Sequence, residues 1–418
     1  MRKVVLLAAA LAAVLGVTAS SATSASSETG ITARTITIGG THPLTGPASL
    51  YATISASMKA YFSYINARKG PDGRRGVYGR QIVYKIYDDG YNPANTVQIT
   101  RRLIEQDKVF AVVGSVGTEH NEAVRPYLNQ LKVPQVLTAT GASTWFTRAN
   151  ITKYPYTRGW FPDYEFEARL YGQAIARNSP NAKIAVLLQN DSFGEDYLRG
   201  LRLGLGGKAS NIAGIERYEV TATDVRSQTA KLRATGATVL VIVATPRFMI
   251  QTYGIANALG WKPAVVYTTL VSATDSFLTL AQRSGGGDLP NNTYSAAYLK
   301  DPANPKWDND AGMKLYKQVM AKYYPNGNAR DGLNVYGVAA AHAFVQLMYK
   351  AGRNPTRASL MRSFNNWREV NPFLLPGNRV RTAGAGDQRP IDCLQLQKFT
   401  NGTFQQVTGL RCRSAAGT

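Results

Sequence analysis

The chain alternates short apolar runs with amphipathic segments, and it does so in two successive rounds. Each run is an almost unbroken series of Val, Ile, Leu and Ala, which is typical of parallel strands covered by helices on both faces. The segments between them have helical spacing, and Asn92-Pro93 opens one with an N-cap residue and a Pro at the first helical position. The pattern predicts an α/β fold with two parallel-sheet units, near 31–157 and 160–288. The expected strands are 35–40, 81–87, 110–113, 134–138, 183–188, 239–244 and 264–268.

The first 27 residues have the pattern of a cleaved signal peptide. A basic start precedes an apolar run at 4–17, and small and hydroxyl residues fill 18–27. The apolar run is short for a membrane span, which needs about 20 residues, although an uncleaved anchor is the alternative. We expect export to the periplasm or cell envelope, with cleavage after Ala19 or Ala25. No Cys lies there to carry a lipid anchor.

About 390 residues remain after this leader, which is more than one hydrophobic core of ~250–300 residues accommodates, so two lobes are expected. The only cysteines, Cys393 and Cys412, flank a turn at 400–403 between two strand-like runs. In an oxidising compartment we expect them to form a disulfide that staples this terminal hairpin. Two unpaired thiols are the alternative, because spacing does not fix geometry.

The composition and the absent motifs limit the possible functions. The net charge is +22, but Lys and Arg are scattered without a run of five, which favours a solvated basic surface over a nucleic-acid binder. The sequence contains no GxxxxGK[ST], CxxC, HExxH or GxSxG motif. His42, His120 and His342 lie far apart, so an enzyme is disfavoured, although a site assembled in space stays open. We expect no cofactor and no metal ion.

The segments that follow the expected strands are rich in Gly, Ser, Thr and aromatic residues. Parallel sheets bind ligands at this edge, beyond the carboxyl ends of their strands. Residues 114–118 end a strand and open a helix; Thr118 suits an N-cap, and the N–H groups behind it suit an anion such as a carboxylate. Ordinary capping without a ligand is the alternative. Ser192 and Glu195 have capping-box spacing and place Phe193 at the mouth of the second unit.

Five of these segments, taken in order, carry a resemblance to a known family. They are 38–47, 84–89, 112–118, 133–143 and 183–194. Their order resembles the branched-chain amino-acid-binding family (periplasmic binding protein type I, Leu/Ile/Val-type), the extracytoplasmic solute receptors of ABC uptake systems. The resemblance implies two Rossmann-like lobes joined by three hinge crossovers. Lobe 1 would comprise 31–157 plus about 290–380, and lobe 2 would comprise 158–289 plus about 381–413.

The resemblance also implies a ligand site. Tyr51 matches an aromatic residue that covers the ligand, Thr118 a hydroxyl residue that holds its carboxylate, and Phe193 an aromatic residue of the second lobe. Thr140 and Ala142 match a pair that binds the polar end, and Tyr336 or Asn334 matches a late wall. The expected ligand-binding set is Tyr51, Ser115, Gly117, Thr118, Thr140, Ala142, Phe193, Thr269 and Tyr336.

One departure from the family pattern affects the ligand. Amino-acid binders carry an acidic residue for the ligand ammonium after the strand at 264–268, but the loop 268–272 has none, and the nearest acid is Asp275. Asp163 or Glu165 is a possible substitute. The expected ligand is therefore an aromatic or aliphatic carboxylate, or a branched-chain or other hydrophobic amino acid. The expected partner is an ABC permease, through which alone the protein meets the membrane, with no nucleic acid; a sensor domain of the same fold is the alternative.

Overall fold

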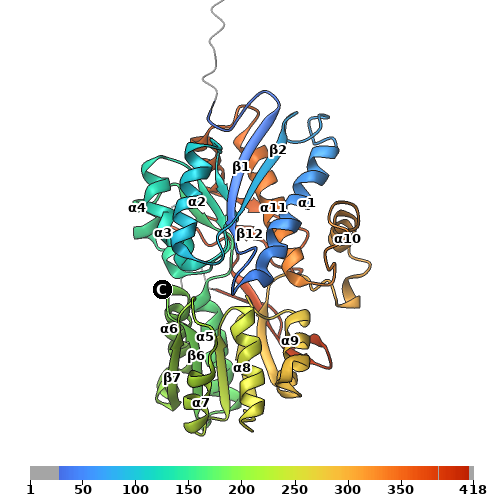
Figure 1. Cartoon of the computed structure of the whole chain (residues 1–418). Helices are drawn as coiled ribbons and strands as arrows, with labels where there is room; N and C mark the ends of the chain where they lie inside the picture. The colour runs from blue at the N-terminus through green and yellow to red at the C-terminus, as the bar shows by residue number, and fades with distance from the viewer. Residues whose placement is uncertain (1–27, 385, 414–418) are drawn as a thin grey trace, which may run out of the picture.

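The computed structural model describes residues 28–384 and 386–413 as two α/β lobes stacked end to end (Figure 1). The predicted signal peptide lies outside these residues. The two-sheet α/β architecture predicted from the alternating pattern is confirmed. No helix among the described residues is long and apolar enough to cross a membrane.

The first lobe is built on a parallel sheet with strand order β2-β1-β3-β4-β5. Its inner strands are short and buried on both faces, so their sequences read as continuous apolar runs. The elements are β1 (Thr35–His42), α1 (Ala52–Ala67), β2 (Gln81–Asp88), α2 (Pro93–Glu105), β3 (Val112–Val113), α3 (Thr118–Gln130), β4 (Gln135–Thr138), α4 (Arg148–Lys153) and β5 (Thr157–Gly159).

The second lobe is built on a mixed sheet with strand order β14-β13-β10-β9-β8-β6-β7, and β15 pairs with β13. Strands β6 to β10 are parallel, whereas β13 runs antiparallel to β10, β14 and β15. The elements are α5 (Tyr164–Asn178), β6 (Ile184–Gln189), α6 (Ser192–Leu205), β7 (Ile212–Tyr218), α7 (Arg226–Ala234), β8 (Val239–Val243), α8 (Pro246–Ala258), β9 (Val265–Thr268), α9 (Asp275–Ala281), β10 (Thr293–Ala297), β13 (Cys393–Thr400), β14 (Thr403–Gln406) and β15 (Arg411–Cys412).

The chain returns to the first lobe between β10 and β13. Helix α11 packs along α1, and a Cβ at Gly337 would lie 2.5 Å from the Ile54 carbonyl oxygen, so glycine is needed for this close approach. The polypeptide thus passes between the lobes after β5, after β10 and before β13. The returning elements are α10 (Ala311–Tyr323), α11 (Gly332–Ala351), α12 (Arg357–Phe364), β11 (Arg368–Glu369) and β12 (Val380–Arg381).

The helix starts show where local sequence signals hold and where they fail. The Asn92 side chain caps α2 by accepting from the Ala94 N–H, as predicted. The Ser192 capping box is wrong: Asp191 caps α6 by accepting from the Gly194 N–H, and Ser192 is the first helical residue. Thr118 is likewise not the N-cap of α3, because Gly117 holds that position with φ 105°, a conformation that favours glycine.

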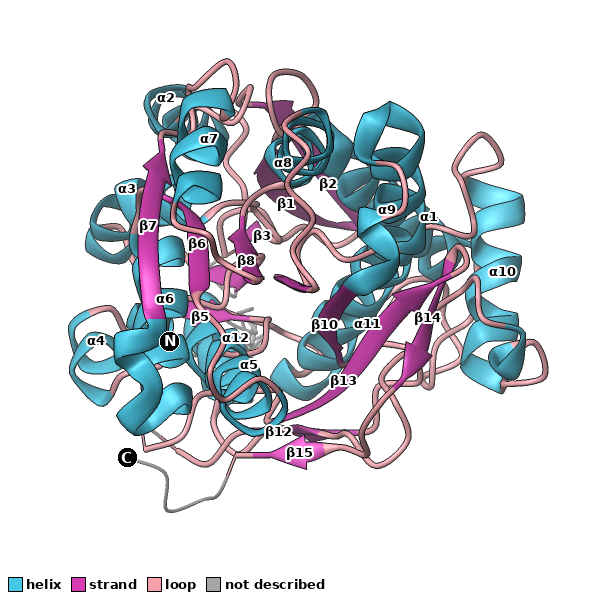
Figure 2. Cartoon of the chain, turned by 90° about the horizontal axis from the view of Figure 1, so that it is seen from below, coloured by secondary structure: helices cyan, strands magenta, loops and turns pink. Residues whose placement is uncertain are grey.

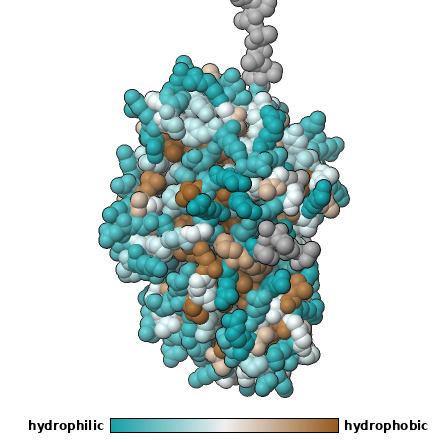
Figure 3. Space-filling view, turned by 180° about the vertical axis from the view of Figure 1, so that it is seen from behind, coloured by the Kyte–Doolittle hydropathy of each residue, from teal (hydrophilic) through white to brown (hydrophobic). Residues whose placement is uncertain are grey.

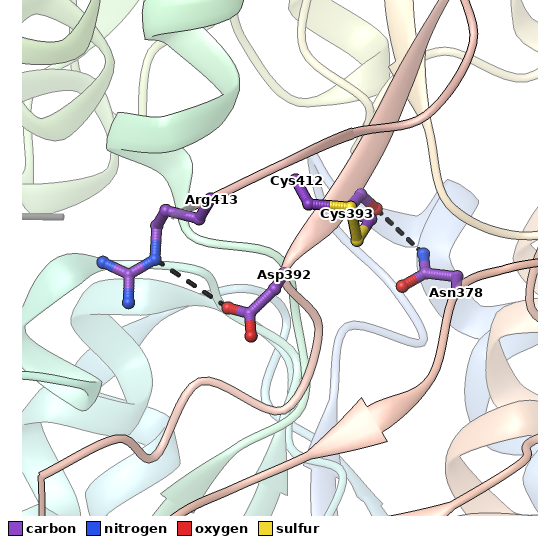
Figure 4. The surroundings of a disulfide bond; sticks show 5 residues. All are labelled: Asn378, Asp392, Cys393, Cys412 and Arg413. Carbon is purple, nitrogen blue, oxygen red and sulfur yellow. Dashed lines mark hydrogen bonds and ion pairs between the residues drawn. A yellow bond between two sulfur atoms is a disulfide. The ribbon is translucent and has the colours of Figure 1, made fainter. Parts of the chain in front are cut away.

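The predicted disulfide between Cys393 and Cys412 is confirmed (Figure 4). The two cysteines are directly opposed in the β13–β15 pair. The Asn378 side chain donates to the Cys393 carbonyl oxygen at 2.8 Å, and Arg413 faces Asp392 at 3.8 Å. The bridge therefore fixes β15, the last described strand, to the sheet of the second lobe.

We expect Cys393→Ser to lower the free energy of unfolding by about 3 kcal/mol, because it removes a cross-link that closes a loop of moderate length. Urea unfolding measures the loss, and Cys412→Ser is the matched control that should reproduce it. Thiol labelling of the unreduced wild type should stay negative after denaturation. Two reactive thiols in that sample would contradict the bridge.

Candidate functional site

A cavity lies where the two lobes meet, with an empty volume of about 1020 Å³ including the part open to solvent. Both lobes contribute to its wall, which lies beyond the carboxyl ends of several strands, the usual place for ligands in parallel α/β proteins. The face seen in Figure 3 is mostly hydrophilic, with apolar residues gathered around its middle. Eight aromatic side chains line the cavity: Tyr51, Tyr91, Phe161, Tyr164, Phe193, Tyr298, Tyr336 and Phe404.

The start of α3 forms the polar wall on the first lobe. Gly117 and Thr118 line the cavity, and the Thr118 hydroxyl lies 2.7 Å from the Thr140 hydroxyl. No side chain caps this helix. A Cβ at Gly117 would meet the His120 ring at 2.4 Å, so only glycine allows the backbone to enter α3 here. The result is a helix N-terminus and the Thr118 hydroxyl at the cavity, with the Thr140 hydroxyl buried behind them, an arrangement suited to an anion.

His120, behind this wall, is neutral. Its ring is buried, and the ring centroid lies 4.2 Å from that of Tyr91. Burial lowers the pKa of His120 to about 4, so the imidazole carries no charge at neutral pH. The anion-compatible wall therefore consists of backbone and hydroxyl groups, not of a cationic side chain.

Aromatic rings that pack edge to face form the wall on the second lobe. Phe193 lies edge-on to Tyr164 and Tyr197, with centroids 5.0 and 5.3 Å apart. Phe161, in the crossover after β5, meets Tyr164 at 5.7 Å and Tyr336 at 5.6 Å. These rings join residues of both lobes in one apolar surface, which is suited to an aliphatic or aromatic ligand body.

A buried carboxyl group supports this wall from behind. Glu167 on α5 has no exposed surface and accepts hydrogen bonds from the Tyr171 hydroxyl, the Tyr197 hydroxyl at 2.5 Å and the Leu270 N–H at 2.9 Å. Burial raises its pKa to about 7, and these donors partly oppose the rise. Because Leu270 lines the cavity, Glu167 fixes the β9–α9 loop to the aromatic wall.

The structure separates the expected ligand-binding residues into two groups. Tyr51, Gly117, Thr118, Phe193 and Tyr336 line the cavity. The other four, Ser115, Thr140, Ala142 and Thr269, are buried behind its wall. The Ser115 hydroxyl accepts from the Thr41 N–H, and the Thr269 N–H donates to the Ile242 carbonyl oxygen. The Thr140 hydroxyl contacts the Thr118 hydroxyl and accepts from the Ala142 N–H. The alternative wall residue Asn334 is also buried, and its amide donates to the Asn328 carbonyl oxygen.

The two acids considered as ammonium partners are engaged elsewhere. Asp163 caps α5 and pairs with Arg389 at 2.6 Å, and Glu165 pairs with Arg199 at 2.6 Å. Neither lines the cavity. Within residues 28–384 and 386–413, no group of three or more His, Cys, Asp or Glu side chains is placed to hold a metal ion.

The sequence interpretation missed several cavity residues. Phe161 and Tyr298 lie in crossovers after β5 and β10, which carry no helix or strand pattern. Tyr91 follows β2, and Tyr164 opens α5. The only available signal was the aromatic run from Trp160 to Tyr164 next to the boundary between the two units.

Comparisons with known proteins agree with the two-lobed α/β fold. A family model described as periplasmic binding protein matches residues 35–403. A search of curated protein sequences finds no match.

Solved structures share the fold over nearly their whole length. A branched-chain amino acid ABC transporter protein from Thermus thermophilus, solved with bound valine, is 19% identical with a TM-score of 0.77 and covers 91% of this chain and 97% of its own. A substrate-binding periplasmic protein from Ralstonia solanacearum is 21% identical with a TM-score of 0.76, covering 89% and 100%. A fatty acid ABC transporter substrate-binding protein from Thermomonospora curvata is 18% identical with a TM-score of 0.73, covering 93% and 95%.

Proposed function

The chain belongs to the periplasmic binding protein family, a family of solute-binding proteins and not of enzymes, and from this premise we propose that it is an exported receptor that captures a small apolar carboxylate for an ABC importer. The observation that carries the proposal is the cavity between the lobes, whose wall combines the start of α3 and the Thr118 hydroxyl with eight aromatic side chains. The polar wall suits the carboxylate and the rings suit the remainder of the ligand.

The capture step in this proposal is closure of one lobe on the other. The first lobe contributes Thr118 and Tyr51, the second contributes Phe193, and the three crossovers act as the hinge. A ligand that touches both lobes favours the closed form by its differential affinity for that form. The closed form would then dock on the permease. The leader expected at residues 1–27 supports export, and the family description supports an extracytoplasmic site of action.

The residues that line the cavity at the start of α3 carry no charge, which favours a free acid over an amino acid. The loop after β9 contributes Leu270 and Val271 to the cavity, and Asp163 and Glu165 are paired with arginines elsewhere. A buried ammonium without a partner is costly. Branched-chain and other hydrophobic amino acids are the second candidate class, favoured by the match to a valine-bound fold at a TM-score of 0.77.

Two measurements test the proposal on the same preparation. Native mass spectrometry of gently purified protein should detect a co-purified small acid, and addition of that acid to stripped protein should reduce the radius of gyration in small-angle scattering. A sensor domain of the same fold would also close on its ligand. Uptake of the ligand by reconstituted permease and ATPase subunits distinguishes a transport receptor from a sensor domain, because a sensor domain supports no uptake.

Phe193→Ala is expected to weaken ligand binding by about 1–3 kcal/mol, because it removes the ring that the second lobe places at the cavity and its edge contacts with Tyr164. Isothermal calorimetry measures the change. Phe364→Ala is the control: Phe364 is equally buried, packs on Trp367 and does not line the cavity, so it should lower stability without changing affinity. Equal affinity losses in both variants would show that the Phe193 effect is structural.

A further inference from the structure

The amino ends of the first-lobe strands lie at the end of the molecule that is farthest from the second lobe (Figure 1). These strands are parallel, and the segments after their carboxyl ends line the cavity, so all five point toward the second lobe. A basic residue lies shortly before each strand: Arg34 before β1, Arg80 before β2, Lys108 before β3, Lys132 before β4 and Lys153 before β5. The fold therefore gathers at one edge of a sheet cations that are scattered along the sequence.

Further cations adjoin this edge. The turn between α1 and β2 supplies several, and the Arg80 guanidinium donates to the Arg353 carbonyl oxygen at 2.8 Å, which places the turn after α11 beside them. Within the described part of the chain, nine of these side chains are exposed and form no ion pair. They define the amino-edge surface: Arg34, Arg68, Lys69, Arg74, Arg75, Lys108, Lys132, Lys153 and Arg353.

The nearby acids do not neutralise the amino-edge surface. Glu28, Glu105 and Asp107 each lie within 4.0 Å of a cation that is outside this set. Asp72 is the acid of the turn between α1 and β2, which carries four of the nine cations. The surface therefore keeps a strongly positive charge.

The amino-edge surface is broad and lies apart from the cavity. Neighbouring strands are about 4.8 Å apart, so a five-stranded sheet spreads these cations over roughly 19 Å. None of the nine residues lines the cavity. A wide array of separate cations suits a flat anionic partner better than a single bound ion. The family is extracytoplasmic, and in that compartment a bilayer with anionic phospholipids is such a partner.

We propose that the amino-edge surface docks the protein on a bilayer that exposes anionic phospholipid headgroups. Docking at this end keeps the cavity away from the lipid, because the cavity lies at the opposite edge of the same sheet. Salt screens an attraction of this kind, so the contact is reversible and concentrates the receptor near the membrane without anchoring it. This contact goes beyond ligand capture, and it is independent of the permease contact expected from the sequence.

Co-sedimentation of the purified exported protein with vesicles tests this docking. Vesicles of equimolar phosphatidylglycerol and phosphatidylcholine should retain the wild type at about 0.1 M NaCl and release it at about 1 M, whereas phosphatidylcholine alone should not retain it. The variant Arg34→Gln/Arg74→Gln/Lys153→Gln removes one cation before each of three strands. It should lower the partition coefficient for the anionic vesicles at least about tenfold, since each cation near an anionic bilayer contributes to binding.

The matched control is Arg177→Gln/Lys183→Gln/Lys262→Gln. These three residues are exposed, form no ion pair and lie at the far end of the second lobe, which faces the viewer in Figure 2. That end lies beyond the screening length of about 10 Å from a bilayer at the amino-edge surface, so the control should stay within about twofold of wild type. Both variants should keep the thermal unfolding of the wild type, because the changed side chains are exposed.

Three outcomes would overturn the docking surface. Equal losses in the two triple variants would show a response to total net charge and not to one surface. Equal retention by the two kinds of vesicle would show that anionic headgroups are not recognised. Retention on heparin without retention by anionic vesicles would assign the surface to a polymeric anion. Each of these results leaves the proposed ligand capture standing, because none of the changed residues lines the cavity.

Discussion

Thr118→Phe should abolish ligand binding while the protein stays folded. Thr118 lines the cavity at the start of α3, and its hydroxyl lies 2.7 Å from that of Thr140. A phenyl ring there fills the space in which the carboxylate would meet the helix N–H groups, and it removes the hydroxyl as well. We expect calorimetry to detect no heat of binding at ligand concentrations about 100-fold above the wild-type Kd, a loss of more than ~2.7 kcal/mol.

Two smaller changes at the same position separate volume from hydrogen bonding. Thr118→Ser keeps the hydroxyl and should bind within a fewfold of wild type, whereas Thr118→Val keeps the shape and should lose about 1–2 kcal/mol of binding free energy. Circular dichroism and thermal unfolding establish that each variant is folded. If folded Thr118→Phe binds like wild type, the carboxylate does not lie at the start of α3.

Glu167→Ala should strongly destabilise the second lobe. It deletes the side-chain acceptor of the buried Tyr197 hydroxyl and of the Leu270 N–H. It also deletes one of the acceptors of the Tyr171 hydroxyl, which reaches the Thr268 carbonyl oxygen as well. Unpaired buried donors cost about 1–3 kcal/mol each, and the deleted side chain also leaves a void, so we expect a loss of roughly 4 kcal/mol in urea unfolding at pH 7. Glu165→Ala is the matched control: its carboxylate forms a partly exposed ion pair with Arg199, and its loss should cost less than about 1 kcal/mol.

The same residue predicts a pH dependence with a definite sign. Burial raises the pKa of Glu167 from 4.5 to about 7, so the folded state binds its proton more tightly than the unfolded state. The contribution of Glu167 to folding stability is fully present below about pH 4.5 and is lost as the pH rises through 7. The difference between its folded and unfolded pKa values corresponds to roughly 3 kcal/mol of folding free energy. Glu167→Gln does not titrate, so the stability of wild type relative to this variant should fall between pH 5 and pH 8. A difference that stays constant over that range would contradict this assignment.

The strand and helix alternation was predictable because buried parallel strands require apolar runs that few other structures tolerate. The ordered motifs also predicted the family, which the match over 35–403 confirms. Strands β5, β7 and β10 were missed. Thr157-Arg158-Gly159 in β5 is too short and polar to stand out, and β7 is an edge strand whose partly exposed residues, such as Glu216 and Arg217, break the apolar run.

The cavity was predictable in part where a residue follows a strand in the usual order, and at Tyr336, on α11, through the family resemblance. Gly117, Thr118 and Phe193 follow this rule, because the carboxyl ends of parallel strands meet at one edge. Phe161, Tyr298 and Asp301 do not follow this rule, because they lie in crossovers between the lobes, which have no periodic sequence pattern. Only the fold shows that these crossovers line the cavity. Glu167 lies in the first turn of α5, as does the partly exposed Glu165, and a single sequence gives no means to distinguish a buried carboxyl from an exposed one.

The central claim, capture of an apolar carboxylate between the lobes, is tested most directly by calorimetry on stripped protein with paired ligands. The panel sets leucine, isoleucine and phenylalanine against their deaminated acids and against benzoate-like acids. The account predicts saturable, one-to-one binding of at least one free acid, with the corresponding amino acid weaker because its ammonium has no partner at the carboxylate wall. Micromolar binding of the amino acids without binding of the deaminated acids would contradict the account, because it requires an ammonium partner at the α3 wall that the arrangement of residues described above does not provide.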